Sequence, residues 1–387
     1  MEKGKRQANF ELLRIVAMGL IITLHFLRHS GLLNPEDESV WFNIAMYWID
    51  SLACCAVNLY VLISGYFLVK SKFSWKKVFL LIAQVLFYSI IIYALFLGFD
   101  RFITHSGAFS LKEFLKGPVL PVITGQYWFV TSYVILYILS PFLNLFITHI
   151  SQSAHRLFII ISGFAFSVIP TFFNGIASSE WTQKNGFSFV WFIVLYFIAA
   201  YFRLYGFPVL KKWKLFLTFI ISGTLPEIIS LLQYYVGILV RGRPFDLVEW
   251  DLYNTLPILT SSIALFVFFS QTIITHVKVS KTILFLASHS FGVYLIHDND
   301  WTRPLLWLDV IAPRRFINSP LIFLILPATV LGIYLACCLI DQVRAWLFIP
   351  LQRSKRLNAL FAKLDAKTNA MLSPIDTEHE QRNQPIE

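Results

Sequence analysis

The sequence predicts an all-α, polytopic membrane protein with about ten transmembrane helices. Of its 387 residues, 57% are apolar, 17% are aromatic and only 14% are charged, whereas an ordinary soluble domain carries about 25% charged residues. Apolar runs of nearly spanning length follow one another along the chain. Basic residues collect in alternate short loops, as membrane topology requires. The formal net charge of +10 therefore indicates topology and not a nucleic-acid partner.

Ten apolar segments are long enough, or nearly so, to cross a hydrocarbon core of about 30 Å. The fifth, sixth and ninth of these segments are short. The fourth follows a turn-rich stretch with Gly and Pro at 117–125, which predicts that its helix begins only after that stretch. An even number of spans places both termini on the same side of the membrane. In chain order the segments are residues 10–27, 44–69, 78–99, 127–147, 157–173, 187–202, 215–235, 252–274, 283–296 and 320–347.

The loops indicate which side that is. With the N-terminus inside, the cytoplasmic segments carry about twice as many Lys and Arg residues as the opposite loops, which is the bias of the positive-inside rule. We therefore expect a multi-pass protein of the cytoplasmic membrane with both termini in the cytoplasm. Residues 1–350 would form the transmembrane domain. Residues 351–387 would form a cytoplasmic tail, with an amphipathic helix over 352–372 and a polar, disordered end.

The first apolar segment holds two polar residues that are rare in such a segment, Arg14 and His25. Eleven residues separate them, which is about three turns and roughly 16 Å, so both side chains point to nearly the same face. An unpaired cation in a spanning helix costs on the order of 3 kcal/mol and normally faces a cavity, a partner or a ligand. Arg14 could instead reach the cytoplasmic headgroups, and His25 could be a structural histidine near the outer interface. Their shared face favours a functional pair.

Other reactive residues have simpler explanations. His25 and His29 have H-x3-H spacing, but no Glu follows the first His and no third ligand is evident, so we predict no metal site. Ser64 stands before a glycine inside an apolar run, where a small pair is more often a close helix contact than a nucleophile. The cysteines form adjacent pairs at 54–55 and 337–338 without CxxC spacing, and we expect them to be buried apolar side chains.

Four stretches taken together resemble a known family. They are NFELLRIVAMGLIITLH in the first segment, NLYVLISGYFLVK in the second, YWFVTSYVILYILSPFLN in the fourth and FGVYLIH in the ninth. As an ordered set they are similar to the acyltransferase 3 family of membrane O-acyltransferases, over about residues 9–345. Within that family, the sequence is most similar to the single-domain enzymes that O-acetylate surface polysaccharides.

The resemblance implies an enzyme that takes an acyl group, in particular an acetyl group, from cytoplasmic acyl-CoA. It would deliver this group to a hydroxyl of an extracytoplasmic cell-surface polysaccharide or lipid-linked glycan. Acetyl-CoA would be a donor substrate and not a permanently bound cofactor. Many relatives carry an additional extracytoplasmic domain, and for this sequence we expect either a separate extracytoplasmic transferase or direct transfer. The alternative is a polysaccharide exporter or flippase without acyl chemistry.

The essential arginine and histidine of that family fall on Arg14 and His25. Forming an ester requires a base near neutral pH, and the unperturbed histidine pKa of about 6.5 suits this task. We expect His25 to be that base or to form a transient acyl-imidazole. Arg14 would hold the donor through carbonyl or phosphate oxygens, which match its rigid fork of donors. An extended pantetheine arm could span the distance between the two residues.

Asp50, in the second segment at a depth similar to that of His25, is our candidate for the group that fixes the His25 tautomer. An exposed acid near the headgroups is an equal alternative. Four lysines of the first inner loop would face the nucleotide phosphates of the donor, although lysines in such a loop are more often topology signals alone. Relatives usually have arginines in this loop, and lysine loses the bidentate geometry. These lysines are Lys70, Lys72, Lys76 and Lys77.

Three residues at predicted outer helix ends are candidates for binding the acceptor. Tyr127, Trp128 and His297 could stack on a sugar ring. Aromatic residues at that depth also form the ordinary interface belt, so both interpretations stay open from the sequence.

Overall fold

A computed structural model of the protein describes residues 7–33, 39–99, 110–173, 176–243 and 250–372. Across these residues the chain is helical and contains no strand, which confirms the predicted all-α class. The long helices are α1 (Ala8–His29), α2 (Val40–Ala53), α3 (Cys55–Leu68), α4 (Trp75–Phe99), α7 (Trp128–His149), α8 (Gln152–Gly163), α11 (Phe189–Tyr205), α12 (Lys212–Arg241), α13 (Leu256–Ser270), α14 (Val277–His297), α16 (Ile322–Arg353) and α17 (Lys355–Met371).

Short helical turns connect the long helices. They are α5 (Leu111–Phe114), α6 (Pro121–Thr124), α9 (Ile169–Phe173), α10 (Ser179–Thr182) and α15 (Thr302–Pro304), the π-helices η2 (Leu115–Val119), η3 (Phe164–Val168) and η5 (Leu305–Val310), and the 3-10 turns η4 (Lys184–Gly186) and η6 (Pro313–Phe316).

Each of the ten predicted segments falls on a helix or on two or three linked helices. Within the described residues, eight helical stretches are long and apolar enough to cross a membrane. A ninth is added if the bent pair of Ser179–Gly186 and Phe189–Tyr205 counts as one span. α13 has 15 residues, about 22 Å of helix, which is shorter than a hydrocarbon core of about 30 Å. The exact number of spans and the side that each terminus faces stay predictions.

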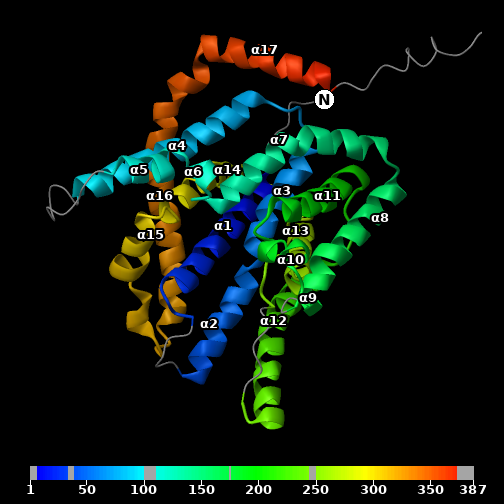
Figure 1. The fold of residues 1–387 in the computed structure, drawn as a ribbon, viewed down its shortest axis with the longest axis vertical. Helices are drawn as coiled ribbons and strands as arrows, with labels where there is room; N and C mark the ends of the chain where they lie inside the picture. The colour runs from blue at the N-terminus through cyan, green and yellow to red at the C-terminus, as the bar shows by residue number, and fades with distance from the viewer. Residues whose placement is uncertain (1–6, 34–38, 100–109, 174–175, 244–249, 373–387) are drawn as a thin grey trace, which may run out of the picture.

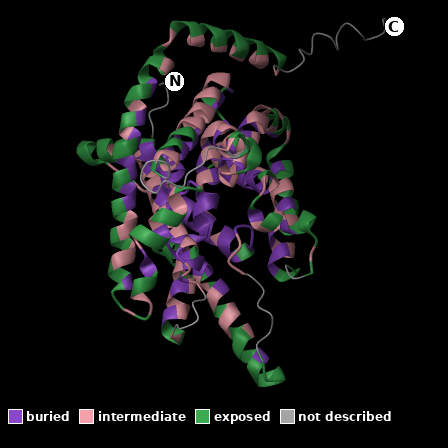
Figure 2. Cartoon of the chain, turned by 60° about the vertical axis from the view of Figure 1, so that its left-hand side comes forward, coloured by how far each residue is buried: buried purple, intermediate pink, exposed green. Residues whose placement is uncertain are grey.

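α1 occupies the interior of the bundle, where it contacts α2, α3, α13, α14 and α16 (Figure 1). Leu13, Ala17 and Ile22 have no exposed surface. Leu13 and Ile22 are nine residues apart, which places them on opposite sides of the helix, so α1 is enclosed by protein on more than one side. Figure 2 shows that buried residues gather along the inner helices, whereas α17 is mostly exposed or half-buried. The polar residues of α1 are therefore held inside the protein.

The C-terminal helix α17 lies across the end of the bundle next to the start of α4 (Figure 1). Asp365 accepts a hydrogen bond from the backbone N–H of Trp75 (2.7 Å) and another from the hydroxyl of Ser74 (2.8 Å). A carboxylate in this position satisfies backbone donors that the first turn of a helix leaves free. The predicted helix over 352–372 thus has a counterpart in α17. The predicted disordered end, 373–387, lies outside the described residues, and the division into a domain and a cytoplasmic tail stays a prediction.

Candidate active site

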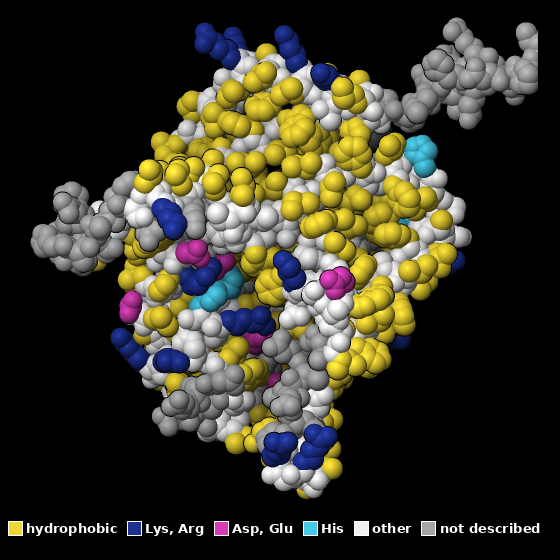
Figure 3. Space-filling model, viewed as in Figure 1, with side chains coloured by type: hydrophobic (Ala, Val, Ile, Leu, Met, Phe, Trp, Pro, Cys, Tyr) yellow, Lys and Arg dark blue, Asp and Glu magenta, His cyan; other side chains and the backbone are white. Residues whose placement is uncertain are grey.

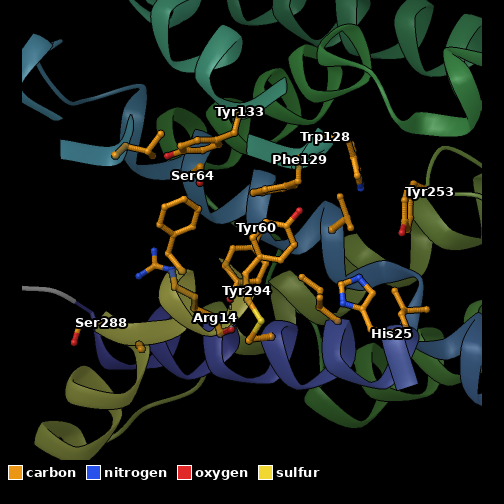
Figure 4. Close-up of a pocket in the computed structure, with 17 residues that line it drawn as sticks. Arg14, His25, Tyr60, Ser64, Trp128, Phe129, Tyr133, Tyr253, Ser288 and Tyr294 are labelled. Atoms are coloured by element: carbon orange, nitrogen blue, oxygen red, sulfur yellow. Dashed lines mark hydrogen bonds between the residues drawn. The ribbon is translucent and has the colours of Figure 1, made fainter. Parts of the chain in front are cut away.

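A cavity of about 320 Å³ runs along one side of α1, and both Arg14 and His25 line it (Figure 4). In the close-up the two side chains rise from the same side of the helix, with His25 at one end of the row of labelled residues and Arg14 nearer the other. Aromatic rings from α3, α7 and α14 form much of the opposite wall, namely Tyr60, Phe129, Tyr133 and Tyr294. The predicted shared face of Arg14 and His25 is therefore present, while the chemical role of each residue stays a prediction.

Arg14 is half-buried and forms an ion pair with Glu11, one turn earlier in α1. The Glu11 side chain is 5% exposed, so this carboxylate compensates part of the cost of a guanidinium inside the bundle. The hydroxyl of Tyr60 donates to the backbone carbonyl of Arg14 at 3.0 Å. A guanidinium has five N–H donors, so Arg14 retains donors that an oxygen-rich ligand in the cavity could use.

The hydrogen bonds of His25 determine which of its ring nitrogens is free. His297 Nδ1 lies 2.6 Å from the carbonyl oxygen of Val293, and because a carbonyl can only accept, Nδ1 donates. A neutral His297 then accepts at Nε2, which lies 2.9 Å from His25 Nδ1, so His25 Nδ1 donates. This assignment leaves a lone pair on Nε2 of His25, in a ring that lines the cavity. A lone pair in that position is what a general base or a nucleophile requires.

Asp298 follows His297 directly and supports the same cluster. Its Oδ1 lies 3.6 Å from His25 Nδ1, 3.5 Å from His29 Nε2 and 3.0 Å from Arg303 Nε. Burial alone would raise the pKa of the Asp298 carboxyl, but His25, His29 and Arg303 together hold it well below its usual value. An ionised Asp298 favours a proton on His25 Nδ1 and stabilises positive charge that develops on the ring. Figure 3 shows histidine, acidic and basic side chains grouped in the middle of one face.

The structure gives Asp50 a different partner from the one that we expected. Its two oxygens accept from Arg28 Nε at 2.9 Å and from Arg28 Nη2 at 2.6 Å, and Arg28 also lies 3.3 Å from Asp251. A bidentate guanidinium is a stronger partner for a carboxylate than a neutral imidazole is. Because Arg28 lies one turn beyond His25 on α1, it takes the position opposite Asp50. The acid beside His25 is therefore Asp298 and not Asp50.

The four lysines of the first inner loop differ in their surroundings. Lys77 lines a second cavity of about 210 Å³, and Leu81 and Tyr133 line both this cavity and the one that holds His25. The two cavities therefore adjoin along α4 and α7. Lys76 donates to the carbonyl oxygen of Gln352 at 3.0 Å. Outside these cavities, the two lysines between α3 and α4 are exposed; they are Lys70 and Lys72. Contact with donor phosphates stays a prediction for all four.

The three candidates for sugar stacking separate into two groups. Trp128 lines the His25 cavity and stacks on Tyr253, with ring centroids 5.9 Å apart and planes inclined by 16°. Tyr127 has no exposed surface, and its hydroxyl donates to Leu295 O and accepts from Asn299. His297 is equally buried. Of the three, sugar stacking therefore fits only Trp128, because Tyr127 and His297 have no exposed surface to offer a ligand. His297 contacts His25 instead.

Two groups of side chains have the composition of a metal site. The ligand atoms of His25, His29 and Asp298 lie within 4.8 Å of one another, and so do those of Asp50, Cys54 and Asp251. In each group an arginine already binds a carboxylate, Arg303 on Asp298 and Arg28 on Asp50. A divalent ion bound to the same carboxylate would be repelled by that positively charged guanidinium. We therefore interpret both groups as hydrogen-bonded clusters. The four cysteines are free and buried.

Sequence reasoning missed the residues that reach His25 from elsewhere in the chain. Asp298 and Arg303 contact its cluster from the segment after α14, and Tyr253 lines its cavity from the segment before α13. The run HDND at 297–300, an ionisable cluster next to an apolar helix end, is a sequence signal that could have marked the first of these. No sequence pattern near Tyr253 marks it, since it reaches the cavity through packing between segments that lie 228 residues apart in the sequence.

Comparison with known proteins identifies the family of this chain. The model of a family described as an acyltransferase domain, the acyltransferase 3 family, matches residues 7–340. No curated protein and no solved structure gives a significant match. The matched range covers most of the chain and includes Arg14, His25, Asp298 and both cavities. The protein is therefore a member of the acyltransferase 3 family, a membrane acyltransferase.

Proposed function

We propose that the protein is an O-acyltransferase that moves an acyl group, specifically acetyl, from cytoplasmic acyl-CoA to a hydroxyl of an extracytoplasmic glycan. One observation carries this proposal: Arg14 and His25 line one cavity, and its walls at Leu81 and Tyr133 continue into the cavity lined by Lys77. A thioester on an extended pantetheine arm could follow this route from Lys77 towards His25. Family membership supports the acyl chemistry, and the donor and the acceptor belong to the proposal.

In this reaction His25 Nε2 takes the proton of the sugar hydroxyl, and the oxygen attacks the thioester carbonyl. The new C–O bond forms as the C–S bond breaks, and the proton on His25 passes to the departing thiolate. In the second version of the reaction, Nε2 attacks the thioester carbonyl, the C–S bond breaks and the CoA thiolate leaves. The sugar oxygen then attacks the acyl-imidazole, the C–N bond breaks, and the hydroxyl proton passes to the freed Nε2. Asp298 stabilises the positive imidazole ring in either version, and Arg14 holds donor oxygens.

The test uses purified protein in proteoliposomes with radiolabelled acetyl-CoA and an extracted surface glycan. We expect label in the glycan and release of free CoA in equal amounts. His25→Gln should lower the rate by about 10³-fold, because a positioned base contributes roughly 10² to 10⁴. His149→Ala is the matched control, since His149 is an exposed histidine at the end of α7, and it should retain the full rate.

The rival function makes the opposite prediction. An exporter or flippase without acyl chemistry would move the glycan across the bilayer while acetyl-CoA remains intact. Glycan movement without CoA release in the wild-type protein would overturn the proposal, and so would an unchanged rate in His25→Gln.

A further inference from the structure

A third cavity lies beside the His25 cavity and has no role in the reaction as described so far. Its volume is about 600 Å³, within the range of roughly 300–1,000 Å³ that is typical of ligand sites. Arg28 forms part of its wall from the end of α1, Asp50 from α2, Glu227 and Tyr234 from α12, and Asp251 from the segment before α13. We name it the acidic cavity.

The acidic cavity adjoins the reaction centre through two stretches of chain. Arg28 follows His25 by three residues on α1, a rise of about 4.5 Å. Asp251 precedes Tyr253 by two residues, and Tyr253 lines the His25 cavity. The two cavities share no lining residue, but these two links bring their walls within about one helical turn of each other along the chain.

The charges of the acidic cavity limit what it can bind. Three carboxylates, on Asp50, Glu227 and Asp251, and one guanidinium, on Arg28, lie in its wall. Arg28 forms a bidentate pair with Asp50 and also lies 3.3 Å from Asp251. Carboxylates therefore outnumber the cation in the wall, and Glu227 is the one that Arg28 does not contact. A ligand with a phosphate or a carboxylate would be repelled.

Glu227 is the residue that points most directly to a missing ligand. In the part of the chain that the structure describes, no cation and no hydrogen-bond donor contacts its carboxylate, and its charged neighbour is another acid, Asp251. An unpaired acid on a membrane-spanning helix is costly and marks a functional site by default. Sugar hydroxyls are suitable donors for such a carboxylate, and the ring of Tyr234, 41% exposed on the cavity wall, offers an apolar face for a sugar.

We infer that the acidic cavity binds the acceptor, and that the acceptor unit is a sugar without negative charge. This inference rests on the proposed function, because it takes the bound sugar to be the unit that receives the acyl group. Glu227 accepts hydrogen bonds from hydroxyls of the sugar, Tyr234 packs against its ring, and the Arg28 pair with Asp50 holds the wall next to His25.

The first measurement is binding without acyl-CoA. Equilibrium dialysis of the purified protein with radiolabelled methyl glucoside and with methyl glucuronide compares two probes that differ in one carboxylate. We expect the neutral probe to bind about tenfold more tightly than the acidic probe. Glu227→Gln keeps the shape of the side chain and removes its charge, so it should narrow this ratio to about twofold or threefold.

Two further variants separate charge from folding. Tyr234→Ala should weaken both probes by about tenfold and leave their ratio unchanged. Glu180→Gln changes an exposed glutamate of α10 outside the cavity and should change neither affinity. Equal affinity for the two probes, tighter binding of the glucuronide, or a ratio unchanged by Glu227→Gln would overturn the inference. Each variant is first checked for a single symmetric peak in size-exclusion chromatography.

The second measurement is acetyl transfer to the same two probes. Transfer that follows the binding preference supports both the inference and the proposed function. Preferential binding of methyl glucoside without any transfer or CoA release overturns the proposed function and leaves a neutral-sugar site in place. Transfer without preferential binding of the neutral probe overturns the inference and leaves the acyl chemistry intact.

Discussion

α14 carries two histidine clusters that contain the same kinds of residue but differ in access. At its end, His297 contacts His25, and Asp298 and Arg303 complete the group. Eight residues earlier, about 12 Å along the helix, His289 Nδ1 lies 2.7 Å from Asp341, which also binds Arg344. We refer to them as the His25 cluster and the Asp341 cluster.

The Asp341 cluster has no position left for a ligand. Asp341 has no exposed surface, and its oxygens accept from Arg344, His289, Tyr88 and Gln84 at 2.6–3.2 Å. None of these residues lines the cavities described above. In the His25 cluster one imidazole nitrogen is bonded and the other belongs to a ring on a cavity wall. Residue type alone does not distinguish a structural cluster from a reactive one; a free lone pair beside a cavity does.

The largest effect that this comparison predicts is on stability. Asp341→Ala leaves the buried Arg344 charge without its partner, which costs about 3–5 kcal/mol. The apparent melting temperature in detergent, followed by tryptophan fluorescence, should fall by many degrees. Asp309→Ala, at an exposed acid of η5, is the control and should melt like the wild type. A melting curve of Asp341→Ala that matches the wild type would contradict the interpretation that this cluster stabilises the fold.

A glycine on α14 tests the same cluster by another route. A Cβ added at Gly292 would overlap the carboxylate of Asp341, and that group cannot move without breaking its hydrogen bonds. Gly292→Ala should therefore destabilise the protein by about 1–3 kcal/mol. Gly332, with no neighbour within 4 Å of an added Cβ on α16, is the matched position, and Gly332→Ala should leave the melting temperature unchanged or slightly raised. Equal melting of the two variants would contradict the close packing.

In the His25 cluster the expected effect is kinetic. His297→Phe removes the acceptor of the His25 Nδ1 proton, so kcat for acetyl transfer should fall by about tenfold while the KM for acetyl-CoA stays the same. His297→Gln offers an amide oxygen as acceptor and should restore most of the rate. If His297 only supported the fold, its substitution would instead reduce the amount of active protein, which titration of active sites would detect. An increase in KM at constant kcat would contradict a positioning role.

The smallest effect should appear on changing the pH. The pKa of Asp298 is lower in the folded protein than its ordinary value of 3.8, so its ionised form stabilises the fold above pH 3.8, and this contribution is lost as the pH falls below that value. Asp298→Asn should be less stable than the wild type by about 1 kcal/mol at pH 7. The difference should shrink at pH 3. Thermal melts at the two pH values measure this difference in stability. A difference that is larger at pH 3 than at pH 7 would contradict the predicted direction of the pH dependence.

The parts of the molecule that the sequence predicted correctly depend on local periodicity. The ten apolar segments each contain helix because their composition leaves no other way to satisfy backbone groups in a bilayer. Arg14 and His25 share a cavity because three helical turns return a side chain to nearly the same direction. The same reasoning could not locate the break at Cys54 between α2 and α3, nor the shortness of α13, since both depend on packing against neighbouring helices.

The parts that it did not predict depend on contacts between distant segments. His25 meets His297 across 272 residues of sequence, and no pattern within either helix specifies that pairing. Asp50 was matched to His25 by depth alone, but depth does not distinguish His25 from Arg28 one turn away. Tyr127 and Trp128 have similar side chains, yet one is buried and the other lines the cavity, because the direction of each depends on how α7 rotates against its neighbours.

Leu81 and Tyr133 are the side chains that two cavities hold in common. In the proposed reaction a thioester would move past these two side chains on its way from Lys77 to His25, so their bulk would limit how long an acyl chain can be. Selection of the acyl chain would then depend on α4 and α7, whereas recognition of the sugar, in the inferred acidic cavity, would depend on α2 and α12. Substitutions that admit a longer acyl chain could therefore arise without altering which glycan is modified.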